Sequence, residues 1–162
     1  LTSTNTNQRT AIQETRASSY GGYAALCAAT VTPERFTCAL AACAPANLLT
    51  LLRAVPPHPA SRRAMLHRRI GHPDTDADML WARSPLSRAH DLSIPLLLAQ
   101  SADDPRVTPA ESAELVAVLR DRGLDHDHLV FEGEGGRLTT PANRMRLRAA
   151  AEAFLARHLA GG

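Results

Sequence analysis

The segment SSYGGYAAL carries the residue best suited to act as a nucleophile. Around Ser19 the chain reads Ala17-Ser18-Ser19-Tyr20-Gly21, which fits the GxSxG pattern of a strand-to-helix turn with alanine in place of the first glycine. Small residues are needed two positions before and after the serine, because neighbouring backbone passes close to it. Such a turn exposes a serine hydroxyl for attack on a carbonyl carbon, so Ser19 is the predicted nucleophile.

A serine hydroxyl is a weak nucleophile and needs a base, usually a histidine that a carboxylate holds in place. The chain contains two adjacent carboxylates, Asp103 and Asp104, just after the apolar segment Ile94–Gln100. If that segment is a parallel strand, the carboxylates lie beyond its carboxyl end, where the acid of such a site belongs. The chain therefore offers a nucleophile and an acid in the order serine, then aspartate.

Strand and helix patterns alternate along the chain. Apolar runs of strand type cover Phe36–Pro45, Ile94–Gln100 and His126–Glu134. Helical patterns cover Tyr20–Ala29 and Pro109–Gly123 between these runs. Alternation of this kind implies βαβ crossovers, and hence a mostly parallel sheet with helices on its faces.

Further helices are predicted outside this alternation. Ala46–Ala54 and Ala60–Ile70 are expected to form a lid or a peripheral layer. A long amphipathic helix begins at Pro141. We expect it to cover the sheet through four apolar residues, Met145, Ala149, Phe154 and Leu155.

Composition sets the broad class of the protein. A chain of 162 residues has the size of one domain, and its net charge of +2 does not indicate a nucleic-acid partner. All 18 basic residues are arginine, and the cluster in SRRAMLHRRI is interpreted as a solvated helix face. No apolar run approaches the roughly 18 residues that a membrane span needs, so we expect a soluble, cytoplasmic protein without a membrane partner.

The three cysteines show no metal-binding spacing. Cys38 and Cys43 would point to opposite faces of a strand, because their separation in the sequence is odd. They and Cys27 are therefore predicted to be small buried side chains rather than ligands or disulfide partners.

Several motifs in order resemble the C-terminal catalytic part of the prolyl oligopeptidase family, which includes dipeptidyl and acylaminoacyl peptidases. They are SSYGGYAAL, RIGHP, WARSPLSRA, IPLLLAQSADDPRV, LVFEGEGG and AEAFLARHL, and the resemblance runs from about Arg9 to the end. It implies a three-layer α/β/α fold, a partial α/β-hydrolase fold that lacks the N-terminal strands. Residues 1–162 would form the C-terminal part of the catalytic domain, with 1–8 as loop or frayed end.

The resemblance also assigns roles to residues. The serine of the family falls on Ser19 and its catalytic aspartate on Asp104, while the Tyr20 backbone N–H would contribute to the oxyanion hole. The family histidine belongs to an EGHG turn, but this chain reads Glu134-Gly135-Gly136-Arg137, so Gly136 occupies its position. The implied substrate is a peptide, and neither a metal nor an organic cofactor is implied.

Other histidines are poorly placed to replace the missing base. His126 and His128 begin a predicted strand and His90 precedes one, so all three lie at the opposite end of the sheet from Asp104. His72, in the RIGHP segment, is not ruled out by this argument.

Three hypotheses follow from these residues. The first is a family member that is inactive or severely impaired as a peptidase. The second is a non-catalytic interaction or structural module, a pseudoenzyme or remnant, whose sheet edge is covered by the missing N-terminal half or by another chain. The third is an active hydrolase that uses another base, such as His72.

Overall fold

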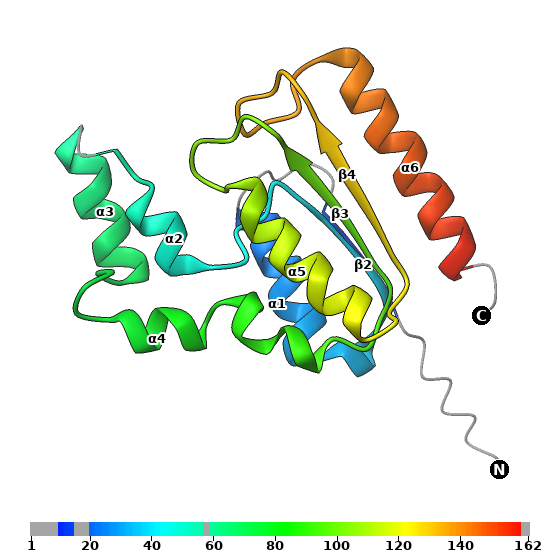
Figure 1. The fold of residues 1–162 in the computed structure, drawn as a ribbon, viewed down its shortest axis with the longest axis horizontal. Helices are drawn as coiled ribbons and strands as arrows, with labels where there is room; N and C mark the ends of the chain where they lie inside the picture. The colour runs from blue at the N-terminus through cyan, green and yellow to red at the C-terminus, as the bar shows by residue number, and fades with distance from the viewer. Residues whose placement is uncertain (1–9, 15–19, 57–58, 160–162) are drawn as a thin grey trace, which may run out of the picture.

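A four-stranded parallel sheet forms the centre of the computed structural model, which describes residues 10–14, 20–56 and 59–159 (Figure 1). Its strands lie side by side in chain order, namely β1 (Thr10–Glu14), β2 (Phe36–Ala42), β3 (Leu96–Ser101) and β4 (His126–Phe131). Each neighbouring pair is parallel, with Leu98, for example, opposite His128. The carboxyl ends of all four strands therefore lie at the same end of the sheet.

Helices cover both faces of this sheet (Figure 1). The helices α1 (Tyr20–Val31) and α5 (Pro109–Asp121) pack on one face, and α6 (Pro141–Leu159) packs on the other. Side chains of β3 alternate between the two layers, because Leu96 and Leu98 belong to one apolar cluster while Leu97 and Ala99 belong to the other. The predicted three-layer α/β/α fold with a parallel sheet is confirmed.

A group of short helices lies beside the sheet rather than on it (Figure 1). This group comprises α2 (Leu48–Arg53), α3 (Ala60–Ile70) and α4 (Ala77–Ala82). A 3-10 segment, η2 (Pro85–Asp91), follows α4 and packs against α1 and α5, and a shorter one, η1 (Pro33–Arg35), precedes β2. The predicted peripheral position of α2 and α3 is confirmed. α2 begins later than predicted because Asn47 caps it, accepting a hydrogen bond from the Leu49 N–H at 3.0 Å.

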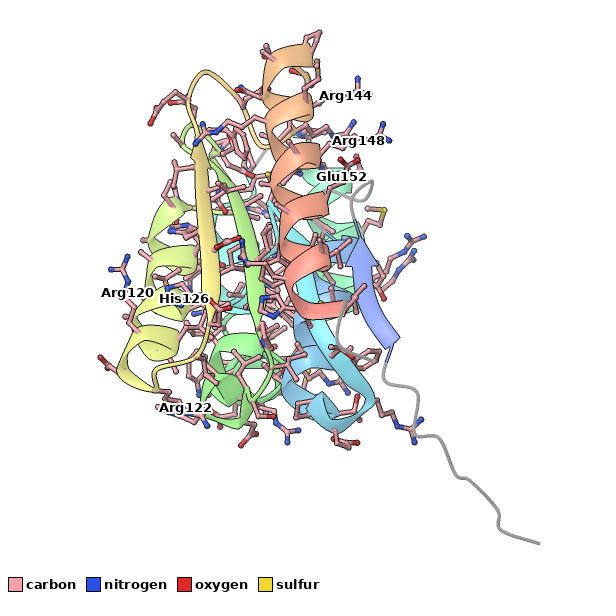
Figure 2. The ribbon with its side chains drawn as sticks, turned by 90° about the vertical axis from the view of Figure 1, so that its right-hand side faces the viewer. Arg120, Arg122, His126, Arg144, Arg148 and Glu152 are labelled. Atoms are coloured by element: carbon pink, nitrogen blue, oxygen red, sulfur yellow. The ribbon has the colours of Figure 1, made fainter. Side chains whose placement is uncertain are left out.

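The buried stripe of α6 differs from the predicted one. Leu147, Ala151 and Phe154 are buried, whereas 72% of Met145 is exposed and Ala149 is also exposed. The buried residues are spaced i, i+4 and i+7, which places them on one face of the helix, and Met145 lies outside that face. Figure 2 shows Arg144, Arg148 and Glu152 along the solvent-exposed side, where Arg148 and Glu152 form an ion pair of 2.9 Å.

Two of the cysteines are buried as predicted. Cys38 and Cys43 are inaccessible to solvent, Cys27 is half-buried, and all three are free thiols. Cys43 follows β2 directly and has a φ of 45°, so it turns the chain away from the sheet. Across residues 10–14, 20–56 and 59–159, no helix is both long and apolar enough to cross a bilayer.

Candidate active site

Asp104 lies in the turn that follows β3, at the end of the sheet where the strands have their carboxyl ends. Its Oδ1 accepts hydrogen bonds from the backbone N–H groups of Arg106 and Val107, at 2.9 and 3.1 Å. Only 4% of the residue is exposed, and Oδ2 is buried without a hydrogen-bond partner among the described residues. The turn therefore fixes one carboxylate oxygen and leaves the other available to a donor.

Gly136 lies against this carboxylate. A Cβ atom built on Gly136 would be 2.6 Å from Oδ2 of Asp104, and the residue has a φ of +91°. The structure thus brings together two positions that the sequence analysis selected, although they are far apart in the chain. It also shows that a side chain at position 136 would begin in contact with Asp104.

Ser101, the last residue of β3, anchors the loop that contains Gly136. The fully buried Ser101 hydroxyl donates a hydrogen bond to the Glu134 carbonyl, and it accepts one from the Gly136 N–H at 3.2 Å. Beside this contact, the exposed Asp103 accepts a hydrogen bond from the Gly133 N–H at 2.8 Å. The loops after β3 and β4 are therefore joined at two points, which holds Gly136 next to Asp104.

Glu134 connects the same loop to the start of α6. Its buried carboxylate accepts four hydrogen bonds, from the backbone N–H and hydroxyl of Thr139, the backbone N–H of Thr140 and the amide of Asn143. These bonds, led by that of the Thr139 N–H, hold the pKa of the Glu134 carboxyl well below its usual range. Glu134 is therefore a charged anchor for this loop.

Tyr20 begins α1, directly after the predicted nucleophile. Ser19 itself lies outside the described residues. Close packing at this end of α1 explains one glycine of the SYGGY motif, because a Cβ on Gly22 would lie 2.6 Å from the Cβ of Ala44. The start of α1 is thus pressed against the chain that leaves β2.

A cavity of about 520 Å³ connects the start of α1 with the Asp104 turn. Tyr20 and Tyr23 line it from α1, while Pro105 and Arg106 line it from the turn. The Tyr23 hydroxyl donates a hydrogen bond to the Arg83 carbonyl at 2.9 Å, and burial raises the pKa of this phenol. Apolar residues of α2 and α3 complete the wall, so the cavity has the size and mixed character of a small-molecule or peptide side-chain site.

None of the described histidines is hydrogen-bonded to Asp104. His126 and His128 belong to β4, at its amino-terminal half, as predicted. His72 lines a different cavity, in which its Nδ1 is 3.8 Å from an oxygen of Asp74. His158 pairs with Asp125 at 3.2 Å.

Sequence reasoning did not identify the roles of Ser101 and Glu134. Both are buried polar residues that hold a loop through its backbone groups. For Glu134 the sequence did contain a signal. It is an acidic residue shortly before the segment Thr139-Thr140-Pro141, where a helix is expected to begin, and a carboxylate near a helix start is favourable.

The fold is that of part of an α/β hydrolase. Sequence comparison matches residues 15–162 to the prolyl oligopeptidase family. The chain therefore belongs to the prolyl oligopeptidase family, as the resemblance of its motifs indicated.

Individual relatives support this assignment. The chain is 43% identical over 145 residues to dipeptidyl aminopeptidase BIII of Pseudoxanthomonas mexicana, covering 88% of this chain and 21% of that protein. It is 36% identical over 146 residues to dipeptidyl peptidase family member 6 of Caenorhabditis elegans, covering 88% and 20%. A puromycin-hydrolyzing peptidase of Mycobacterium tuberculosis has a similar structure, with a TM-score of 0.78, 27% identity and coverage of 87% and 21%. The chain thus spans about a fifth of the length of these relatives.

Proposed function

We propose that this chain is the C-terminal part of a serine peptidase domain that hydrolyses peptide bonds very poorly or not at all. Ser19 is the nucleophile, Asp104 is the orienting acid, and Gly136 stands where the general base of the family would be. The observation that carries the proposal is the contact of Gly136 with the Asp104 carboxylate, whose Oδ2 has no hydrogen-bond donor among the described residues.

The chemistry explains why activity depends on this position. In acyl transfer the serine Oγ attacks the carbonyl carbon while a base takes its proton, and the base later gives that proton to the leaving amine. The backbone N–H of Tyr20, at the start of α1, can stabilise the negative oxygen that forms. Without a base the serine keeps its proton, and loss of the base in an unrelated serine protease costs on the order of 10⁶ in rate.

The position of His72 argues against it as a substitute base. It lines a cavity other than the one lined by Tyr20, Pro105 and Arg106. Its backbone N–H donates a hydrogen bond to Asp76 at 2.7 Å, which ties it to the loop before α4.

A second candidate function is that of a non-catalytic module. In the described sheet β1 pairs with β2 and has no further neighbour, so one edge is open to another strand. The rest of the peptidase domain or another chain would cover this edge.

A fluorophosphonate probe tests the catalytic proposal, because it reacts with serines that a base activates. We expect labelling far below one probe per chain, and no difference between wild type, Ser19→Ala and the neighbouring control Ser18→Ala. Labelling would be read by intact-mass spectrometry on protein whose circular dichroism confirms folding. Stoichiometric labelling that Ser19→Ala alone abolishes would overturn the proposed loss of activity.

A further inference from the structure

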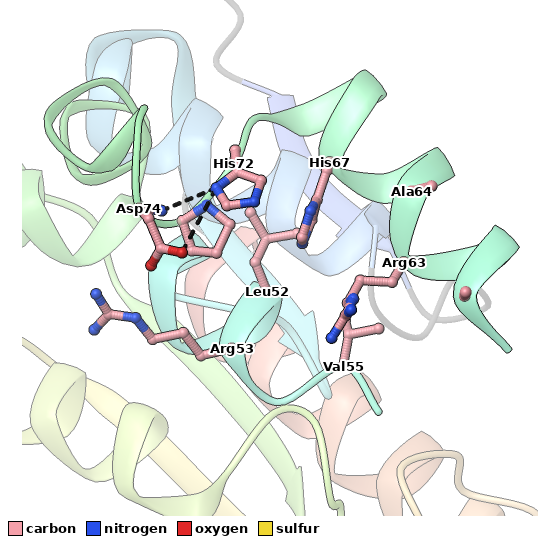
Figure 3. A pocket seen from close by; sticks show the side chains of 10 residues that line it. Leu52, Arg53, Val55, Arg63, Ala64, His67, His72 and Asp74 are labelled. Carbon is pink, nitrogen blue, oxygen red and sulfur yellow. Dashed lines mark hydrogen bonds and ion pairs between the residues drawn. The ribbon is translucent and has the colours of Figure 1, made fainter. Parts of the chain in front are cut away.

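Figure 3 shows a second cavity, of about 570 Å³; Leu52 and Val55 line both this cavity and the one beside Tyr20. We call the second cavity the histidine pocket. Among the described residues, its polar lining consists of five side chains, Arg53, Arg63, His67, His72 and Asp74. Its volume falls within the range of about 300 to 1,000 Å³ that is typical of small-molecule sites.

The charge of this pocket is predominantly positive. Arg53 and Arg63 both line the pocket, and Figure 3 shows them on opposite sides of Leu52. Neither guanidinium forms an ion pair with any residue that the structure describes, although each keeps its charge at all physiological pH values. The one carboxylate of the described lining, that of Asp74, is exposed, as are Arg53 and Arg63. Solvent therefore screens all three charges, and the two arginines leave a net positive charge.

The two imidazoles add a hydrogen-bond donor to these charges. Nδ1 of His72 accepts a hydrogen bond from the Asp74 backbone N–H at 3.3 Å, which assigns the proton of the neutral ring to Nε2. His67 packs edge-to-face against this ring, with 4.5 Å between the centroids, and so orients it. Nε2 of His67 is buried and has no hydrogen-bond partner in the described part of the chain.

A metal ion does not suit this pocket. Within the described ranges no group of three histidine, cysteine or acidic side chains is arranged to hold one. Two guanidinium groups would also repel a cation, whereas they match the oxygen geometry of carboxylate and phosphate groups.

The apolar lining indicates that the ligand also has a carbon skeleton. Leu52 and Val55 are buried at the base of the pocket, and Pro73 lies beside them. These side chains can contact an apolar body while Arg53 and Arg63 pair with an anionic head. We propose that the histidine pocket binds a small organic anion through a carboxylate or phosphate group.

Three probes with the same aromatic ring test this site on the full 162-residue chain. They are phenyl phosphate, benzoate and the neutral amide benzamide, with binding followed by NMR shifts of the histidine ring signals. We expect one or both anions to bind and to shift the His67 and His72 signals, while benzamide does not. The anion that binds with the higher affinity identifies the preferred head group.

Matched arginine variants locate the binding. Arg53→Gln and Arg63→Gln are each expected to weaken the bound anion at least about tenfold, the effect of losing one charge-assisted hydrogen bond. Arg68→Gln is the control, because Arg68 lies on the same helix but lines neither cavity. Equal binding of benzamide, absence of anion binding, or retention of affinity in both pocket variants would each overturn the proposal. Thermal unfolding of every variant confirms that it remains folded.

Discussion

At the scale of single residues, the contact between Gly136 and Asp104 is the feature with the clearest consequences. Gly136 is held in the left-handed region, and its missing side chain is what leaves room for the Asp104 carboxylate. Two glycines of the same loop have positive φ, but they differ in surroundings. A Cβ on Gly133 would have no atom within 4 Å, so this residue provides a matched control.

Gly136→Ala should therefore destabilise the protein more than Gly133→Ala. Both substitutions carry the cost of about 1 to 2 kcal/mol for a side chain in the left-handed region. Gly136→Ala adds an overpacking cost of about 1 to 3 kcal/mol, because its Cβ meets Asp104. Urea unfolding measures the loss of unfolding free energy in each variant. When Asp104→Ala is also present, Gly136→Ala should no longer cost more than Gly133→Ala. Equal losses at the two glycines would show that the contact carries no strain.

The same contact limits what restoring a histidine can do. Gly136→His introduces the Cβ that approaches Asp104, so the loop or the carboxylate must shift before the ring can accept a proton. The resemblance to the family located both positions from sequence. It did not reveal their packing, because a motif specifies residue types and not the space between two loops.

At the scale of the elements, α6 depends on Glu134 at its start and on Phe154 along its buried face. Glu134 anchors the start of α6. It accepts hydrogen bonds from the backbone N–H groups of Thr139 and Thr140, just before the helix, and from the side-chain amide of Asn143 in its first turn. Phe154 is fully buried against the sheet. One residue fixes where the helix begins, and the other fixes which side faces the core.

Glu134 should make the stability of the protein fall at acidic pH. Its folded pKa lies below that of the unfolded chain, about 4.3, so its contribution is present above that value and is lost as the pH falls below it. We expect Glu134→Gln to lower the urea midpoint at pH 7 and to flatten the loss of stability between neutral and acidic pH. Glu132→Gln, at an exposed neighbour, is the control. An unchanged midpoint at pH 7 would contradict this role.

Phe154→Ala and Met145→Ala should differ sharply, although both residues were predicted to cover the sheet. Loss of the buried ring should cost about 3 to 5 kcal/mol, whereas truncation of the exposed methionine should stay within about 0.5 kcal/mol. Denaturant unfolding at neutral pH measures both values. A comparable loss for Met145→Ala would mean that this side chain packs against the core.

The prediction for α6 was partly wrong because apolar residues occur on more than one side of the helix. Met145 and Leu147 are equally plausible by type, and only the position of the sheet decides between them. The strands β2 and β3 were easier to locate, since their apolar runs are continuous and are buried on both sides. The short helix α4 and the 3-10 segment η2 were not predicted.

At the scale of the whole molecule, the strand order determines where other parts of a peptidase can attach. The described sheet ends at β1 on one side and at β4 on the other. The match covers only 21% and 20% of the curated relatives. The fold class followed from the alternation of strands and helices, whereas that alternation does not indicate what pairs with the outer side of β1.

The open edge predicts self-association of the 162-residue chain. An unpaired edge strand presents backbone N–H and C=O groups that another copy can use. We expect light scattering coupled to size exclusion to show oligomers. A second protein would carry, before residue 1, the segment that precedes the matched region in the Pseudoxanthomonas mexicana relative. We expect this chimera to be more monomeric than the 162-residue chain. A strictly monomeric chain at high concentration would contradict this expectation.

Leu52 and Val55 form a wall with a cavity on each side, because both residues line the histidine pocket and the cavity beside Tyr20. Any occupant that shifts these two side chains changes the shape available to a second occupant on the other side. Thermodynamic linkage then requires the effect to be mutual, so each ligand alters the affinity of the other by the same factor. Leu52 of α2 and Val55, which follows that helix, are therefore the side chains through which such coupling would pass.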